Sequence, residues 1–244
     1  MVPLTVGGVR AKVRAVAVAV GVGVAGPAAS LALVLLSGLL FALLGISLDL
    51  LPRIVFLLVL TQYVGFGGVA FAYFAVRGLA PASVGVRWPT WRELLLVVGG
   101  FVLAVALAIA GSMVLAQTSV EGASNQTAEA GMQNPDLFLV LIPLAFLVIG
   151  PCEELLFRGV VQRRLREAFH PAVAILLAAA LFATIHFLAL AGPTVARLAT
   201  ISLLFFPSLV LGTAYELTDN LVVSATIHAM YDALIFGVLY LTTA

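Results

Sequence analysis

The sequence predicts an all-α protein, a polytopic bundle of about seven transmembrane helices within a range of six to eight. Hydrophobic residues make up 63% of the 244 positions and charged residues only 9%, whereas soluble domains carry roughly 25% charged residues. Apolar runs of about 20 residues, the length that crosses a bilayer, follow one another along the chain. These spans leave no room for a folded soluble domain, so we expect one transmembrane domain over residues 1–244.

The apolar runs place the spans in order. The expected spans are residues 16–51, 54–76, 94–116, 136–161, 172–191, 197–217 and 221–241. A polar loop is expected at 117–135 and a basic surface segment at 163–170. Pro143 and Pro151 should make the fourth helix irregular, because each proline removes an internal hydrogen bond.

The basic residues predict the orientation and exclude one class of partner. Ten of the twelve Lys and Arg residues fall on the side of the N-terminus, and cytoplasmic loops collect such residues. We therefore expect an integral, multi-pass membrane protein whose N-terminus is cytoplasmic. A net charge of +1 gives no concentrated basic face for nucleic acid. The expected partners are the lipid bilayer and a peptide or membrane-protein substrate.

A pair of glutamates lies near the inner end of the fourth expected helix, in Glu153-Glu154-Leu-Leu-Phe-Arg158. Adjacent helix positions point in different directions, so the two carboxylates should have different roles. Glu154 and Arg158 are four residues apart in the favourable order for an ion pair. Glu153 has no local partner, and a desolvated carboxylate that binds protons readily suits a general base.

Two histidines and an aspartate lie within later apolar helices, in Phe182-Ala-Thr-Ile-His186 and His228-Ala-Met-Tyr-Asp232. Ionisable groups inside a membrane are costly, so they mark pairing or chemistry. Imidazole transfers protons or ligates metals near neutral pH. A carboxylate four residues later in the helix can orient the imidazole ring.

Together these side chains supply what peptide hydrolysis requires. Glu153 would activate water, while His186, His228 and Asp232 would assist. Two histidines and a carboxylate also match a catalytic zinc with an open position, so one divalent metal on His186, His228 and Asp232 is one alternative. A mechanism without metal, based on the glutamate, is the other. Glu154 and Arg158 would support the site structurally.

The three motifs resemble those of the CPBP intramembrane peptidases, an Abi-like family that includes CAAX prenyl endopeptidases and bacteriocin-processing enzymes. That family carries EExxxR, FxxxH and HxxxN-or-D on successive transmembrane helices, and EELLFR, FATIH and HAMYD fill all three within residues 137–240. The resemblance implies an intramembrane endopeptidase for a membrane-associated or prenylated substrate, with a catalytic cavity opening toward the cytoplasmic side. The CAAX endopeptidases have Asn where this chain has Asp232, which favours a metal ligand over an oxyanion donor.

Two other functions use similar residues. Intramembrane Glu, His and Asp also build the proton relays of transporters, and an inactive membrane scaffold of the same family would share the motifs. The sequence leaves these as alternatives to the enzyme.

Helix lengths raise one conflict. With the expected ends, Glu153 would lie about 5 Å below the inner surface, His228 about 12 Å and His186 about 22 Å. These side chains can lie close together only if the helices are strongly tilted, if the fifth helix extends further toward the inner surface, or if the fourth helix is broken at Gly150-Pro151.

Overall fold

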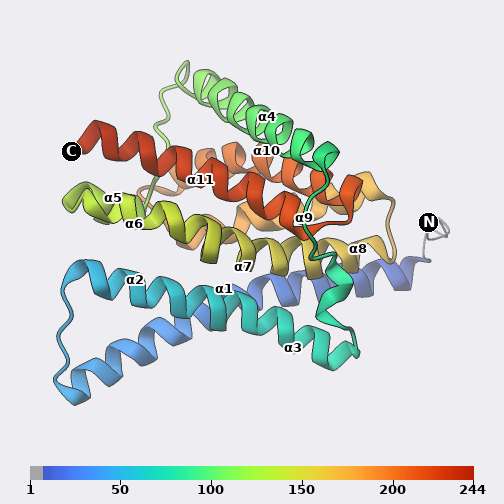
Figure 1. Ribbon diagram of the computed structural model, residues 1–244, viewed down its shortest axis with the longest axis horizontal. Coiled ribbons are helices and arrows are strands. Elements are labelled where there is room, and N and C mark those ends of the chain that lie inside the picture. Colours follow the sequence, from blue (N-terminus) through green and yellow to red (C-terminus); the bar gives the residue numbers. More distant parts are fainter. Residues whose placement is uncertain (1–7) are drawn as a thin grey trace.

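The computed structural model describes residues 8–244 as a bundle of long apolar helices (Figure 1). In this part of the chain, seven helical segments are long and apolar enough to cross a membrane. They are Val9–Leu44, Leu50–Arg77, Trp91–Leu115, Asp136–Arg166, Pro171–Leu188, Thr194–Thr218 and Leu221–Thr243. The predicted all-α, polytopic membrane fold is confirmed.

Four of the seven spans are unbroken α-helices, and the other three change helix type along their length. The unbroken helices are α1 (Val9–Leu44), α4 (Trp91–Leu115), α10 (Thr194–Thr218) and α11 (Leu221–Thr243). The fifth span ends in a 3₁₀ turn and consists of α9 (Pro171–Ile185) and η5 (His186–Leu188).

The second and fourth spans contain π-helical segments. The second span consists of α2 (Leu50–Leu60), the π segment η1 (Thr61–Gly67) and α3 (Gly68–Arg77). The fourth consists of α6 (Asp136–Leu144), η3 (Ala145–Ile149), α7 (Gly150–Glu154), η4 (Leu155–Gln162) and α8 (Arg163–Arg166). Pro143 directly precedes η3, so the predicted irregularity is present. Segments of π-helix are frequent at functional sites because they redirect side chains.

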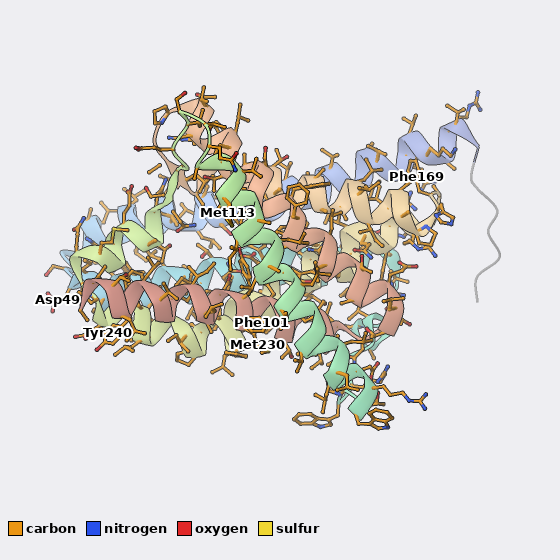
Figure 2. The ribbon with its side chains drawn as sticks, turned by 90° about the horizontal axis from the view of Figure 1, so that it is seen from above. Asp49, Phe101, Met113, Phe169, Met230 and Tyr240 are labelled. Atoms are coloured by element: carbon orange, nitrogen blue, oxygen red, sulfur yellow. The ribbon has the colours of Figure 1, made fainter. Side chains whose placement is uncertain are left out.

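The bundle has two chemically different ends. The basic end carries arginines that follow or precede the spans, namely Arg77, Arg87, Arg163, Arg164 and Arg166. The loop end carries residues 117–135 and 189–193. Figure 2 marks both ends, with Phe169 at the basic end and with Asp49 and Tyr240 at the other.

Residues 117–135 are more ordered than the predicted polar loop. They contain β1 (Ser124–Asn125) and the short helix α5 (Gln126–Gln133). The Asn125 side chain accepts a hydrogen bond from the backbone N–H of Thr127 and so caps α5. β1 pairs antiparallel with β2 (Leu190–Ala191), and this short pairing joins two connections at the loop end.

The fourth span lies inside the bundle from Val148 onward, whereas Phe146 and Leu147 before it are exposed. Its Leu156, Phe157 and Val161 are fully buried in the largest apolar cluster, which also includes residues of α1 and α9. A second cluster lies where α4 crosses α10 and α11, and Phe101 and Met230 meet there in Figure 2. A helix buried on all sides is apolar around its circumference except where its polar groups are paired.

Two predicted boundaries are wrong. Residues 16–51 contain one span, as predicted, but it ends at Leu44 and not at Leu51, because Gly45 takes the left-handed conformation at φ 64° and Leu50 begins α2. Residues 163–170 are not simply a surface segment, because the fourth helix continues through Arg166. Arg163 donates a hydrogen bond to the carbonyl of Ser83, and Arg166 pairs with Glu216 at 2.8 Å. These partners allow the helix to carry its arginines past the predicted end.

Candidate active site

The fourth helix ends at Arg166, five residues later than predicted. This later end removes the predicted difference in depth between Glu153 and His186. Glu153 lies thirteen residues before Arg166, and His186 lies fifteen residues after Pro171, which corresponds to about 20 Å and 22 Å along the two helices. Both side chains are therefore at similar depth from the basic end. None of the three predicted solutions is needed, since the extension occurs in the fourth helix and not in the fifth.

The predicted ion pair of Glu154 and Arg158 is present and completely buried. Arg158 Nε donates to Glu154 Oε2 at 3.0 Å, and both side chains have no exposed surface. Arg158 Nη2 also donates to the hydroxyl of Ser208 on α10 at 2.9 Å. A buried charge pair requires such additional partners, because desolvation opposes it. The pair thus ties α7 to η4 and to α10.

The second oxygen of Glu154 orients His228. His228 Nδ1 lies 3.1 Å from Glu154 Oε1, and because a carboxylate only accepts, Nδ1 carries the hydrogen. His228 Nε2 then faces Asp232 Oδ2 at 3.5 Å and Glu153 Oε2 at 4.0 Å. The imidazole thus lies beside three carboxylates, those of Glu153, Glu154 and Asp232.

His186 is held in one tautomer by its own helix. Its Nδ1 lies 2.8 Å from the carbonyl oxygen of Phe182, so Nδ1 is the donor. Its Nε2 is free to accept and lies 3.9 Å from Glu153 Oε2. The Phe182 ring lies beside both imidazoles, with ring centroids 4.7 Å from His186 and 5.7 Å from His228. The aromatic residue of this motif therefore packs the two histidines together.

Glu153 points away from Glu154 and toward the histidines, as adjacent helix positions require. Its Oε1 accepts a hydrogen bond from Gln62 Nε2 of η1 at 2.9 Å. Its Oε2 is the oxygen nearest both imidazole Nε2 atoms. The gaps of 3.9 Å and 4.0 Å are too long for direct hydrogen bonds and leave Oε2 able to contact a small molecule.

Two residues of this arrangement were missed from the sequence, Gln62 and Ser208. Both are polar side chains inside apolar spans and are almost fully buried, at 7% and 0% exposure. Polar residues at such positions are uncommon and usually face the interior of a bundle. That signal was available, but it is weaker for an uncharged side chain than for Glu or His.

A cavity of about 330 Å³ contains the site. Near its base are Glu153, His186, His228 and Asp232. It extends to the loop end, where Ala123, Asn125, Thr127, Ala128 and Leu190 line it, and apolar side chains of α2, α10 and α11 form most of the wall between. The cavity therefore runs from the carboxylates and imidazoles away from the basic end.

The predicted metal site gains no support from this geometry. Across residues 8–244, no group of three or more His, Cys, Asp and Glu side chains is placed to hold a metal ion. His228 directs Nδ1 to Glu154 Oε1 and His186 directs Nδ1 to the carbonyl of Phe182, so each ring offers only its Nε2 to a ligand. His186, His228 and Asp232 do not form a group that could hold a metal ion, and we derive no step through one.

Comparison with known families agrees with the motifs. Residues 135–234 match the family described as Type II CAAX prenyl endopeptidase Rce1-like. This segment of the chain is Rce1-like. The match confirms the predicted resemblance to the CPBP intramembrane peptidases. A search of curated proteins and a search of solved structures found no match. The Rce1-like segment begins at α6 and includes all six predicted site residues, whereas Gln62 lies outside it.

Proposed function

We propose that the protein is an intramembrane endopeptidase that cleaves a peptide bond of a membrane-associated or prenylated, CAAX-type substrate with water activated by Glu153. One observation carries the proposal. A single carboxylate oxygen, Glu153 Oε2, faces two imidazole Nε2 atoms at 3.9 Å and 4.0 Å inside a cavity. The Rce1-like segment supports the same class of reaction.

The chemistry follows from the hydrogen positions. A water molecule between the three groups would donate one hydrogen to Glu153 Oε2 and the other to His186 Nε2, the nitrogen that does not face the carbonyl of Phe182. Glu153 takes the first proton as the water oxygen bonds to the carbonyl carbon of the substrate. Because the water donates both of its hydrogens, the lone pairs of its oxygen are free to face the substrate.

The negative charge that develops on the carbonyl oxygen needs a donor. His228 supplies it through Nε2–H when the ring is positively charged, a state that Glu154 and Asp232 stabilise. The proton on Glu153 then moves to the leaving nitrogen, and the carbon–nitrogen bond breaks. The products are a carboxylic acid and an amine, and Glu153 returns to its starting state. The acid still carries the second hydrogen of the water and becomes a carboxylate by passing that proton to the amine.

Purified protein in proteoliposomes tests the proposal. A prenylated CAAX peptide and its unprenylated counterpart should be supplied, and the fragments measured by mass spectrometry. We expect cleavage by the wild-type protein and none by the Glu153→Gln variant. Solute flux without cleavage would support a proton-coupled transporter instead. An inert protein that still captures a partner after Glu153→Gln would support a scaffold.

Asp232 allows a milder prediction. In Asp232→Asn, the amide oxygen can still accept from His228 Nε2–H, and CAAX endopeptidases resemble that variant. We expect kcat to fall about 10-fold for Asn and about 100-fold for Ala, because only Asn retains an acceptor. Steady-state kinetics of the two variants measure this difference. Equal losses in both variants would mean that the negative charge itself is required.

The orientation in the membrane is a further part of the proposal. Arg158 is fully buried and no longer counts as a loop residue. Nine basic residues remain on the side of the N-terminus, and only Arg53 and Arg197 lie on the other side. We place the N-terminus and the basic end in the cytoplasm. The cavity extends toward the loop end, which this orientation places on the other side of the membrane from the N-terminus.

Chemical labelling of single introduced cysteines measures the orientation of the protein in the membrane. The natural Cys152 is buried and should not react with an impermeant maleimide. Ser119→Cys at the loop end should be labelled in intact cells, and Ala82→Cys at the basic end only after permeabilisation. The reverse pattern would place the N-terminus outside and the cavity on the cytoplasmic side.

A further inference from the structure

Gln62 makes the only hydrogen bond to the Glu153 side chain that comes from residues 8–244. Its Nε2 donates to Glu153 Oε1 at 2.9 Å, although the two residues are 91 positions apart. Both residues are 7% exposed. A neutral amide holds the carboxylate without the positive charge that an arginine or lysine would add.

The backbone that carries Gln62 is held from two sides. Ser30 of α1 donates to the carbonyl of Thr61 at 3.1 Å, and α1 passes so close to η1 that no Cβ fits at Gly65. On the other side, the hydroxyl of Tyr63 donates to the carbonyl of Leu147 in the fourth span at 2.9 Å. The π segment thus places the amide of Gln62 opposite Glu153 with little freedom.

Stability alone does not account for this glutamine. Its Oε1 is buried and has no hydrogen-bond partner among residues 8–244, and a buried acceptor without a partner is unfavourable. Residues that break a packing rule of this kind are expected where function requires them. The amide is therefore retained for its donor, which reaches Glu153.

We propose that Gln62 is a positioning residue for the general base. By holding Oε1, it turns Oε2 of Glu153 toward His186 and His228 and fixes the oxygen that receives the proton from water. This inference rests on the proposed function. It extends the site to the second span, which lies outside the Rce1-like segment.

The test replaces Gln62 by methionine, which keeps the volume of the side chain and removes the donor. We expect kcat for a cleaved peptide to fall about 10- to 100-fold, since a small misplacement of a catalytic group costs up to about 100-fold. KM should stay within about 2-fold, because Gln62 acts on Glu153 and not on the bound substrate. The midpoint of thermal unfolding in detergent should stay within about 3 °C, since an unpaired acceptor is removed along with the hydrogen bond.

Tyr63→Phe is the matched control. It removes one hydrogen bond between the same two spans, from the neighbouring residue, without touching Glu153. We expect its kcat to fall less than about 2-fold, because Ser30 and the close packing at Gly65 still hold the π segment and the Gln62 amide is intact. An equal loss of kcat in both variants would show that packing of the second span, and not the amide, is responsible, and would overturn the inference.

A second background separates this inference from the proposed function. In Glu153→Asp the shorter carboxylate cannot reach Gln62, so adding Gln62→Met should change its residual kcat less than about 2-fold. The same loss in both backgrounds would overturn the positioning role. Wild-type turnover in Glu153→Gln would overturn the proposed function and this inference together. An inactive Glu153→Gln with a fully active Gln62→Met would overturn the inference alone.

Discussion

Replacing Glu153 by glutamine should reduce kcat for peptide cleavage by about 100- to 10,000-fold, the range in which a general base contributes. The amide has nearly the same shape and can still contact Gln62, but it cannot take a proton from water. In the proposed mechanism His186 accepts only a hydrogen bond from the other hydrogen of the water, so we do not expect it to replace Glu153 as the base. The measurement is single-turnover cleavage of the peptide in proteoliposomes.

The control is the same substitution at an acidic residue away from the cavity. Glu167 at the basic end forms a partly exposed ion pair with Arg77, and Glu167→Gln should retain full turnover. Both variants should insert and unfold as the wild type does. More than a tenth of wild-type kcat in Glu153→Gln would contradict the assignment of Glu153 as the base.

The largest loss of stability is expected from Arg158→Met. The change leaves Glu154 charged in a place with no exposed surface, and breaking a buried pair on one side costs about 3 to 5 kcal/mol. The hydroxyl of Ser208 also loses its donor. The midpoint of thermal unfolding and the yield of folded protein in detergent measure the effect.

A double variant separates stability from activity. Adding Glu154→Gln to Arg158→Met removes the uncompensated charge and should recover much of the lost stability. Activity should stay low, because Glu154 Oε1 no longer stabilises the positive charge on His228. Arg77→Met, which breaks an exposed pair, should cost about 0 to 1 kcal/mol. Full activity of the double variant would mean that Glu154 does not act through His228.

The sequence predicted the fold class and the spans because hydrophobicity and length alone determine which segments cross a bilayer. The EExxxR spacing predicted the ion pair of Glu154 and Arg158 because four residues bring side chains to one face of a helix. Helix ends were less predictable. Arginine normally marks the membrane surface, but Arg163 and Arg166 find partners on neighbouring elements and remain within the helix.

The parts of the site that the sequence missed depend on contacts between distant segments. Nothing in the residues around Gln62 indicates that a π segment directs its amide to Glu153. The tautomer of His186 likewise follows from the carbonyl of Phe182, a contact within its own helix that only coordinates reveal. The direction of the cavity depends on the connections that line the end furthest from Glu153. Hydropathy does not predict which connections these are.

The path from Glu153 to the loop end also has a consequence for where cleaved material appears. On the side of the site toward the basic end, Glu154, Arg158 and Gln162 have no exposed surface. A fragment released from the site would have to leave by the route that admitted the substrate, or sideways into the lipid. Each turnover would then deliver its soluble fragment to a single compartment, the one that the α5 connection faces.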